Sequence, residues 1–206
     1  MGKDIFNLLK HFLLKEDTKV DNLWLLTEER PKASVIIQII NMYCTNFKDS
    51  ITLCDNVKIR PCIKNGVFQF VYQVEGLTVK NAASIFIKTV SGSSSFLDFL
   101  LFKQTNAPTE GSTSDNLLMA IEETKTNDDE SRNTGVYQRG SKFVYISPYY
   151  PNAKLYMLYN EELGARENKR PSDTSIFGTN ILLTLGVTII GKNIGKWFKP
   201  FQSLEE

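Results

Sequence analysis

The stretch LLMAIEETKTND occupies residues 117–128 and opens as an apolar run. Successive side chains of a β-strand point to opposite faces, so Glu123 and Lys125 share one face while Glu122 and Thr124 share the other. Both faces are apolar along the preceding residues. The stretch therefore predicts a central strand that is covered on both sides and whose polar end emerges at a rim or lines a cleft.

A second acidic residue lies in the preceding apolar segment, SFLDFLLF, at residues 95–102. Asp98 is the isolated charge there, which is costly unless it is paired or bound to a metal ion. If residues 95–103 and 117–126 form neighbouring antiparallel strands, Asp98 approaches Glu123, provided that the two strands have a suitable offset. Asp98, Glu123 and Lys125 then predict a Mg²⁺ site that polarises a phosphodiester and helps to generate hydroxide, with the lysine orienting the water.

The rest of the chain predicts helices followed by a run of antiparallel strands. Residues 1–50 are expected to be helical, including 32–47, and Asn65-Gly66 predicts a tight turn between two strands. Residues 84–90 and 95–103 are expected to form a second hairpin, and 104–116 a long polar loop. The remaining expected elements are a helix over 128–146, a strand over 153–160, a basic loop at 165–173 and a final helix leading into a strand. Together these elements predict a mixed α/β, α+β-like domain with a central mixed β-sheet flanked by helices.

One domain over residues 1–206 is expected, with a helical part at 1–55, a sheet core with the active site at 56–160 and a C-terminal helix and strand at 161–206. The last residues, KPFQSLEE, show no evident stop to the fold, which suggests a segment of a longer enzyme.

Composition excludes several classes of protein. The net charge of +1 gives no bulk electrostatic attraction to nucleic acid, so such a partner requires a local basic patch. One histidine and three cysteines without a CxxC pair disfavour zinc sites and Ser/His/Asp hydrolases. The odd cysteine count and the lack of a signal peptide predict a cytoplasmic protein. The longest apolar run, at residues 179–190, is too short to span a membrane.

Asp98, a spacer of about two dozen residues and Glu123-Thr124-Lys125 together resemble the active site of the PD-(D/E)XK nuclease superfamily. The text SFLDF…AIEETKT…YQRGSKFVYI looks most like a type II restriction endonuclease, although Leu97 stands where that family often has proline. The resemblance implies a restriction-endonuclease-like fold in a bacterial cell. It also implies that Asp98 and Glu123 bind Mg²⁺, that the carbonyl of Thr124 is a further ligand, and that Lys125 assists the attacking water.

The helix after the motif supplies the remaining candidates. The resemblance implies an accessory polar residue there, for which Gln138 is the candidate, and Arg132, Arg139 and Lys142 are candidates for contacts to DNA phosphates or guanine edges. The expected partner is double-stranded DNA. A homodimer is expected because a palindromic site calls for a two-fold symmetric protein.

Three alternatives stay open. The first is a nuclease of the same superfamily that acts in repair, recombination or phage DNA processing. The second is a non-catalytic DNA-binding or interaction module in which the acids and the lysine form a salt-bridged strand end. In the third, Glu122, Glu123 and Lys125 are only a solvated strand end, and Asp98 caps a turn.

Overall fold

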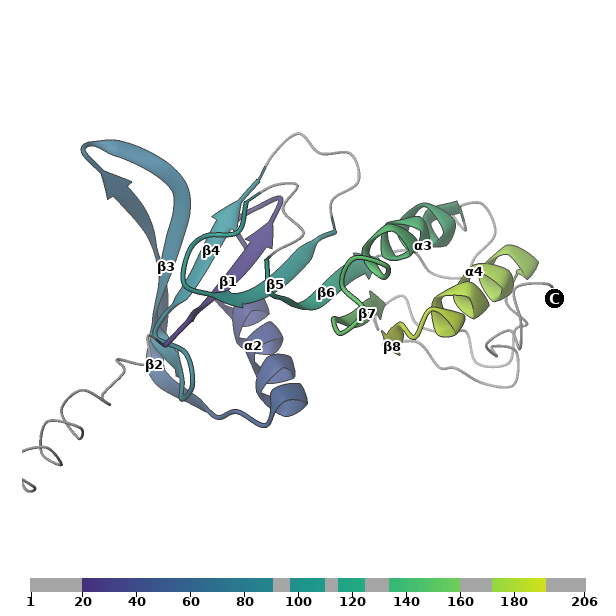
Figure 1. Cartoon of the computed structure of the whole chain (residues 1–206), viewed down its shortest axis with the longest axis horizontal. Coiled ribbons are helices and arrows are strands. Elements are labelled where there is room, and N and C mark those ends of the chain that lie inside the picture. The colour runs from purple at the N-terminus through teal and green to yellow at the C-terminus, as the bar shows by residue number, and fades with distance from the viewer. Residues whose placement is uncertain (1–19, 91–96, 110–114, 125–133, 160–171, 192–206) are drawn as a thin grey trace, which may run out of the picture.

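The computed structural model describes residues 20–90, 97–109, 115–124, 134–159 and 172–191; in the helix at 134–146, side chains are described from Arg139 onward. In this part of the chain, one mixed sheet has the strand order β2-β3-β4-β1-β5-β6-β7-β8. Figure 1 shows α2 beside the first part of the sheet, and α3 and α4 beside its other end. A central mixed sheet flanked by helices was the expected architecture, and it is confirmed.

The strands are β1 (Asn22–Thr27), β2 (Ile51–Lys64), β3 (Val67–Val79), β4 (Ile85–Thr89), β5 (Phe99–Gln104), β6 (Leu117–Thr124), β7 (Lys154–Tyr159) and β8 (Thr188–Ile190). The helices are α2 (Ala33–Phe47), α3 (Thr134–Ile146) and α4 (Asp173–Thr184). The predicted helix at 32–47, the strands around Asn65-Gly66 and the strand at 153–160 are therefore confirmed. The described part of the 104–116 segment, beyond the end of β5, is a loop.

Strand β1 corrects two expectations. Residues 22–27 form a strand and not part of a helical region, because their continuous apolar run is buried on both faces of the sheet. This strand also lies between β4, with which it is parallel, and β5, with which it is antiparallel. The hairpin predicted from residues 84–103 is therefore wrong, although both of its strands exist. Residues 1–19, also expected to be helical, lie outside the described residues.

The two faces of the sheet bury different side chains. Leu23 and Leu25 of β1 pack on one face with the buried side of α2, whereas Trp24 and Leu26 pack on the other face in a cluster that contains Phe143 of α3 and Leu182 of α4. This alternation follows from the two-residue period of a strand. Both faces of the central strands are consequently covered by helices.

Strand β6 has the central position that its sequence predicts. It pairs antiparallel with β5 and parallel with β7, so α3 forms the crossover between two parallel neighbours. Met119, Ala120 and Ile121 have no exposed surface. Of the polar residues that follow, Glu122 and Thr124 remain buried and Glu123 is partly exposed, at the end of the strand where β5 begins.

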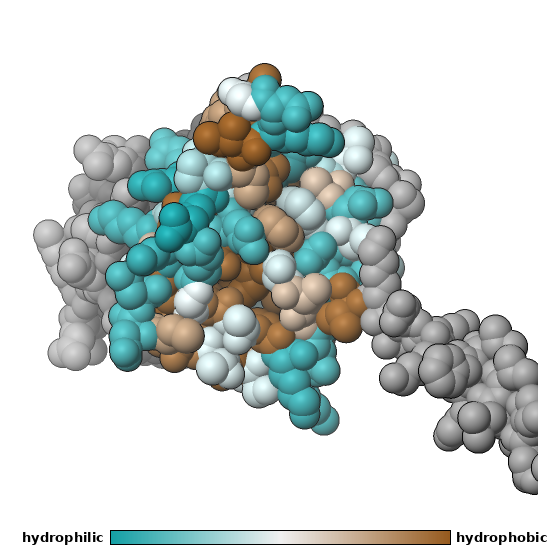
Figure 2. Space-filling model, turned by 90° about the vertical axis from the view of Figure 1, so that its left-hand side faces the viewer, coloured by the Kyte–Doolittle hydropathy of each residue, from teal (hydrophilic) through white to brown (hydrophobic). Residues whose placement is uncertain are grey.

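Strands β2 and β3, which we call the β2–β3 ribbon, extend past the rest of the sheet (Figure 1). Strand β3 pairs with β4 only between Val71 and Val74, so no other strand among the described residues pairs with the turn end of the ribbon. Asn65 and Gly66 both have positive φ, at 52° and 75°, which is the conformation of a type I′ hairpin turn. Figure 2 views this side of the molecule and shows hydrophobic residues exposed among hydrophilic ones.

No helix among the described residues combines the length and the apolar character that a membrane crossing requires.

Candidate functional site

Asp98 and Glu123 meet where β5 begins and β6 ends. The register pairs Phe99 with Ile121, so one further step places Asp98 across from Glu122. Asp98 precedes the strand, and its Oδ2 accepts a hydrogen bond from the backbone N–H of Glu123 at 2.6 Å. The offset that was assumed between the two strands therefore brings the Asp98 carboxylate against the backbone of Glu123.

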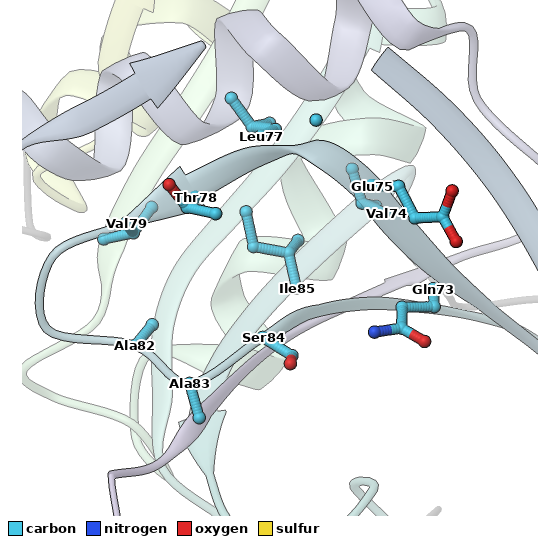
Figure 3. A pocket seen from close by; sticks show the side chains of 11 residues that line it. Gln73, Val74, Glu75, Leu77, Thr78, Val79, Ala82, Ala83, Ser84 and Ile85 are labelled. Carbon is cyan, nitrogen blue, oxygen red and sulfur yellow. The ribbon is translucent and has the colours of Figure 1, made fainter. Parts of the chain in front are cut away.

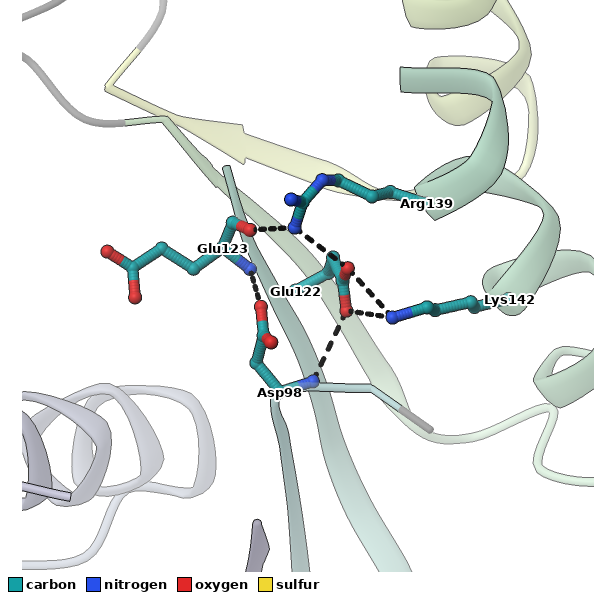
Figure 4. A network of polar contacts seen from close by, with 5 residues as sticks. All are labelled: Asp98, Glu122, Glu123, Arg139 and Lys142. Atoms are coloured by element: carbon teal, nitrogen blue, oxygen red, sulfur yellow. Dashed lines mark hydrogen bonds and ion pairs between the residues drawn. The ribbon is translucent and has the colours of Figure 1, made fainter. Parts of the chain in front are cut away.

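The neighbouring acid, Glu122, points the other way. Figure 4 shows its side chain directed toward α3, whereas the side chain of Glu123 points to the opposite side of β6. Lys142 Nζ donates to both Glu122 oxygens, at 3.0 and 3.1 Å, and Arg139 donates to Oε1 at 3.1 Å. Arg139 also donates to the carbonyl of Glu123. The second oxygen, Oε2, accepts from the backbone N–H of Asp98 at 3.2 Å.

Glu122 has no exposed surface. Burial raises the pKa of its carboxyl, and the negative charge of Asp98 raises it further, while the hydrogen bond and charge of Lys142 and the bond from the Asp98 backbone act to lower it. The net direction is upward because removing the charge from water is the largest effect. Two cations and a backbone donor are the compensation that a buried carboxylate requires.

The predicted metal ligands offer carboxylate and carbonyl oxygens, which are the hard ligands that Mg²⁺ prefers. Asp98 and Glu123 are both partly exposed. Within the described residues, Asp98 uses Oδ2 in its bond to β6, and the carboxylate of Glu123 accepts no hydrogen bond or ion pair. The donor set fits a hard cation, although no group of three or more His, Cys, Asp and Glu side chains in the described chain is placed to hold one.

The other predicted residues have different outcomes. Lys125 and Arg132 lie outside the described residues, as does most of the basic loop at 165–173. Gln138 lies in α3, but its side chain is outside the described part of that helix. Thr124 is fully buried at the end of β6. Arg139 and Lys142 are directed at Glu122, and their contact with DNA stays a prediction.

Glu122 had no predicted role at the metal site, although the sequence contains a signal for one. Two adjacent acids at the end of a buried strand must point to opposite faces, so one of them faces the crossover helix. Arg139 and Lys142 are three residues apart in that helix, which places both on one of its sides. A buried acid and a pair of cations at helical spacing together indicate an ion network between β6 and α3.

A separate cavity of about 270 Å³ lies between β3 and the segment that leads into β4 (Figure 3). Residues 73–79 and 82–85 line it, and Glu75 is the carboxylate among them. Glu75 is already paired with Arg60 at 2.5 Å. The cavity therefore has no acidic cluster comparable with the end of β6.

The chain matches no protein-family model, and searches of curated proteins and of solved structures give no match either. The resemblance to PD-(D/E)XK nucleases therefore depends on the residues of this chain alone.

Proposed function

We propose that the chain is a Mg²⁺-dependent endonuclease that hydrolyses phosphodiester bonds of double-stranded DNA inside a bacterial cell, as a type II restriction enzyme with a restriction-endonuclease-like fold. The main support is the hydrogen bond from the Glu123 backbone N–H to the Asp98 carboxylate at the junction of β5 and β6. This contact joins the two acids of the motif across neighbouring antiparallel strands. The resemblance predicted that the same two residues act together.

In this proposal, the carboxylates of Asp98 and Glu123 and the carbonyl of Thr124 hold the ion. A divalent ion supplies Lewis acidity to the phosphodiester and lowers the pKa of water. The hydrogen bond from the Glu123 backbone orients Asp98, since it occupies Oδ2 and limits rotation of the carboxylate. Lys125 positions the attacking water, and Gln138 is an accessory polar group.

DNA is held by cations around this end of the sheet. Arg132 and Arg139 follow the motif, and the side chain of Arg139 is 32% exposed beside Glu122. Lys142 is less exposed, at 19%, and its ammonium is engaged by a carboxylate. Because Arg139 is the more exposed of these two cations, we assign it a larger share of DNA contact than Lys142, with Arg132 as a further candidate. A homodimer would present two such sites to the two strands of a palindrome.

Cleavage of phage DNA by the purified chain, with Mg²⁺ or with EDTA, tests the proposal. We expect discrete fragments that require Mg²⁺ and that disappear in Asp98→Asn, Glu123→Gln and Lys125→Ala. Glu75→Gln is the matched control, because it removes a paired glutamate charge far along the sheet, and it should cut like the wild type. Cleavage at structural features, without a defined sequence, would favour a repair, recombination or phage nuclease.

A non-catalytic DNA-binding module is the second candidate, and one observation favours it. The Glu122–Lys142–Arg139 network is a salt-bridged strand end of the kind such a module would contain. DNA binding by the wild type without any Mg²⁺-dependent cleavage would support the module and contradict the nuclease.

A further inference from the structure

Glu122 joins α3 to the segment that carries Asp98. One side of its carboxylate receives Arg139 and Lys142 from α3, and Oε2 receives the backbone N–H of Asp98. The nuclease motif assigns no role to this residue. Its burial and its three donors nevertheless constrain it more than Asp98 and Glu123, which are partly exposed.

Asp98 depends on β6 for its position. It lies before the first paired residue of β5, and two hydrogen bonds tie it to β6. In one bond its backbone N–H donates to Glu122, and in the other its carboxylate accepts from the backbone of Glu123. Because the two bonds hold opposite ends of the residue, they define both the path of its backbone and the direction of its carboxylate.

We propose that Glu122, held by Lys142 and Arg139, is a positioning residue that places the Asp98 carboxylate beside Glu123 for a divalent cation. This inference rests on the proposed function. Glu122 does not touch the cation, because its side chain points away from Glu123 and toward α3 (Figure 4). Groups that orient metal ligands in this way typically change metal affinity by about 10- to 100-fold when they are removed.

The cations of α3 contribute to the positioning of Asp98 because they hold the Glu122 carboxylate. With Lys142 removed, the buried carboxylate keeps Arg139 and the Asp98 backbone as donors, and it gains from turning toward water or toward Arg139. Either movement loosens the bond to Asp98. The geometry therefore predicts that Lys142→Met weakens metal binding, although Lys142 is not itself a metal ligand.

The first experiment measures Mg²⁺ binding by calorimetry for the wild type, Glu122→Gln, Lys142→Met and Lys142→Arg. We expect affinity to fall by about 10- to 100-fold in Lys142→Met and to recover in part in Lys142→Arg. Glu122→Gln loses the attraction for both cations, but a smaller loss is expected because it keeps an acceptor oxygen for the Asp98 backbone N–H. Glu75→Gln is the control and should bind Mg²⁺ like the wild type.

Two further readouts separate positioning from general damage to the fold. The exchange rate of the Asp98 amide, followed by NMR without metal, should rise in Lys142→Met. In cleavage assays, the Mg²⁺ concentration for half-maximal rate should rise in Lys142→Met and, to a smaller extent, in Glu122→Gln. If the single variants unfold, the double variant Glu122→Gln/Lys142→Met removes both charges together and carries the same test.

The outcomes distinguish this inference from the proposed function. A wild type that binds Mg²⁺, together with variants that bind it equally well and keep a slow Asp98 amide exchange, overturns the positioning role alone. A wild type that neither binds Mg²⁺ nor cuts DNA overturns the proposed function, and the positioning role with it.

Discussion

The junction of β5 and β6 and the β2–β3 ribbon each contain a glutamate paired with a cation, but the surroundings of the two pairs differ. At the junction, the side chain of Glu122 is 1% exposed and that of Lys142 is 19% exposed. In the ribbon, the side chains of Arg60 and Glu75 are 60% and 42% exposed. Water screens the second pair and not the first, so the same chemical contact has different energetic weight in the two regions.

The apolar side chains of the two regions differ in the same way. Phe143 of α3 is completely buried among residues from several strands and α4. Phe70 of β3 is 63% exposed, with a positive φ of 56° and a tilted contact to Phe68. The helix-covered end of the sheet therefore supplies stability, while the ribbon has large apolar groups that folding leaves in water.

The largest expected effect on stability comes from truncating one apolar side chain in each of the two regions. Phe143→Ala should lower the free energy of unfolding by about 3–5 kcal/mol, because it removes buried surface and leaves a cavity between α3 and the sheet. Phe70→Ala, the matched change in the ribbon, should cost less than about 1 kcal/mol. Urea unfolding of both variants measures the difference. Equal losses would show that the ribbon tip is buried in solution, for example by another chain.

The second prediction compares the two ion pairs. Lys142→Met should destabilise the fold by roughly 3 kcal/mol, because it leaves the buried Glu122 carboxylate with fewer donors. Glu75→Gln in the exposed pair should cost about 0–1 kcal/mol, and less in high salt. Thermal unfolding at low and high ionic strength checks both values. A salt-sensitive loss for Lys142→Met would contradict the burial of its partner.

The third prediction concerns two glycines of the ribbon with similar φ. A Cβ on Gly76, at φ +78°, would lie 2.5 Å from the backbone oxygen of Asn56, whereas a Cβ on Gly66, at φ +75°, meets nothing within 4 Å. Gly66→Ala carries only the strain of the left-handed conformation, about 1–2 kcal/mol. Gly76→Ala adds a clash with backbone and should cost about 2–3 kcal/mol. Chemical denaturation of the two variants separates strain from contact, and equal costs would exclude the clash.

The sequence predicts the elements that depend on local chemistry. The dipeptide Asn65-Gly66 predicts the hairpin turn in which it lies, and the apolar run at residues 117–121 predicts a buried strand because both of its faces are apolar. The pairing of strands is not local. Nothing near residues 84–103 indicates that β1, which begins some sixty residues earlier, separates β4 from β5. A short continuous apolar run such as LWLL is compatible with either a helix or a buried strand, so residues 22–27 were assigned wrongly.

The candidate site was predictable only in part, because some of its contacts also depend on how distant elements pack. The spacing of Asp98 and Glu123 predicts that the two meet if the strands are neighbours, and β5 and β6 are neighbours. The roles of Arg139 and Lys142 depend on the direction of α3 over the sheet, which no short pattern encodes. Their charges suggested DNA contacts, whereas the fold directs them onto the adjacent buried acid.

The smallest predicted effect lies on the α2 face of the sheet and has a pH signature. Tyr43 is almost fully buried, donates to Asp49 Oδ2 at 3.2 Å and accepts from Lys103 Nζ at 3.4 Å. Burial raises the pKa of its phenol, and the charge of Asp49 and the hydrogen bond to it raise the pKa further. The protonated phenol is therefore favoured by folding, so this stabilisation is complete below the unfolded pKa of about 10 and is lost as the pH rises above it.

Tyr43→Phe should cost about 1 kcal/mol at neutral pH, because it removes the bond to Asp49 and leaves the ring in place. The same variant should lose less stability than the wild type between pH 9 and roughly 11, since it has no phenol to ionise at this position. Urea unfolding at several pH values measures both effects. If the two proteins lose stability in parallel over that range, ionisation of the Tyr43 phenol is not responsible for the alkaline loss of stability.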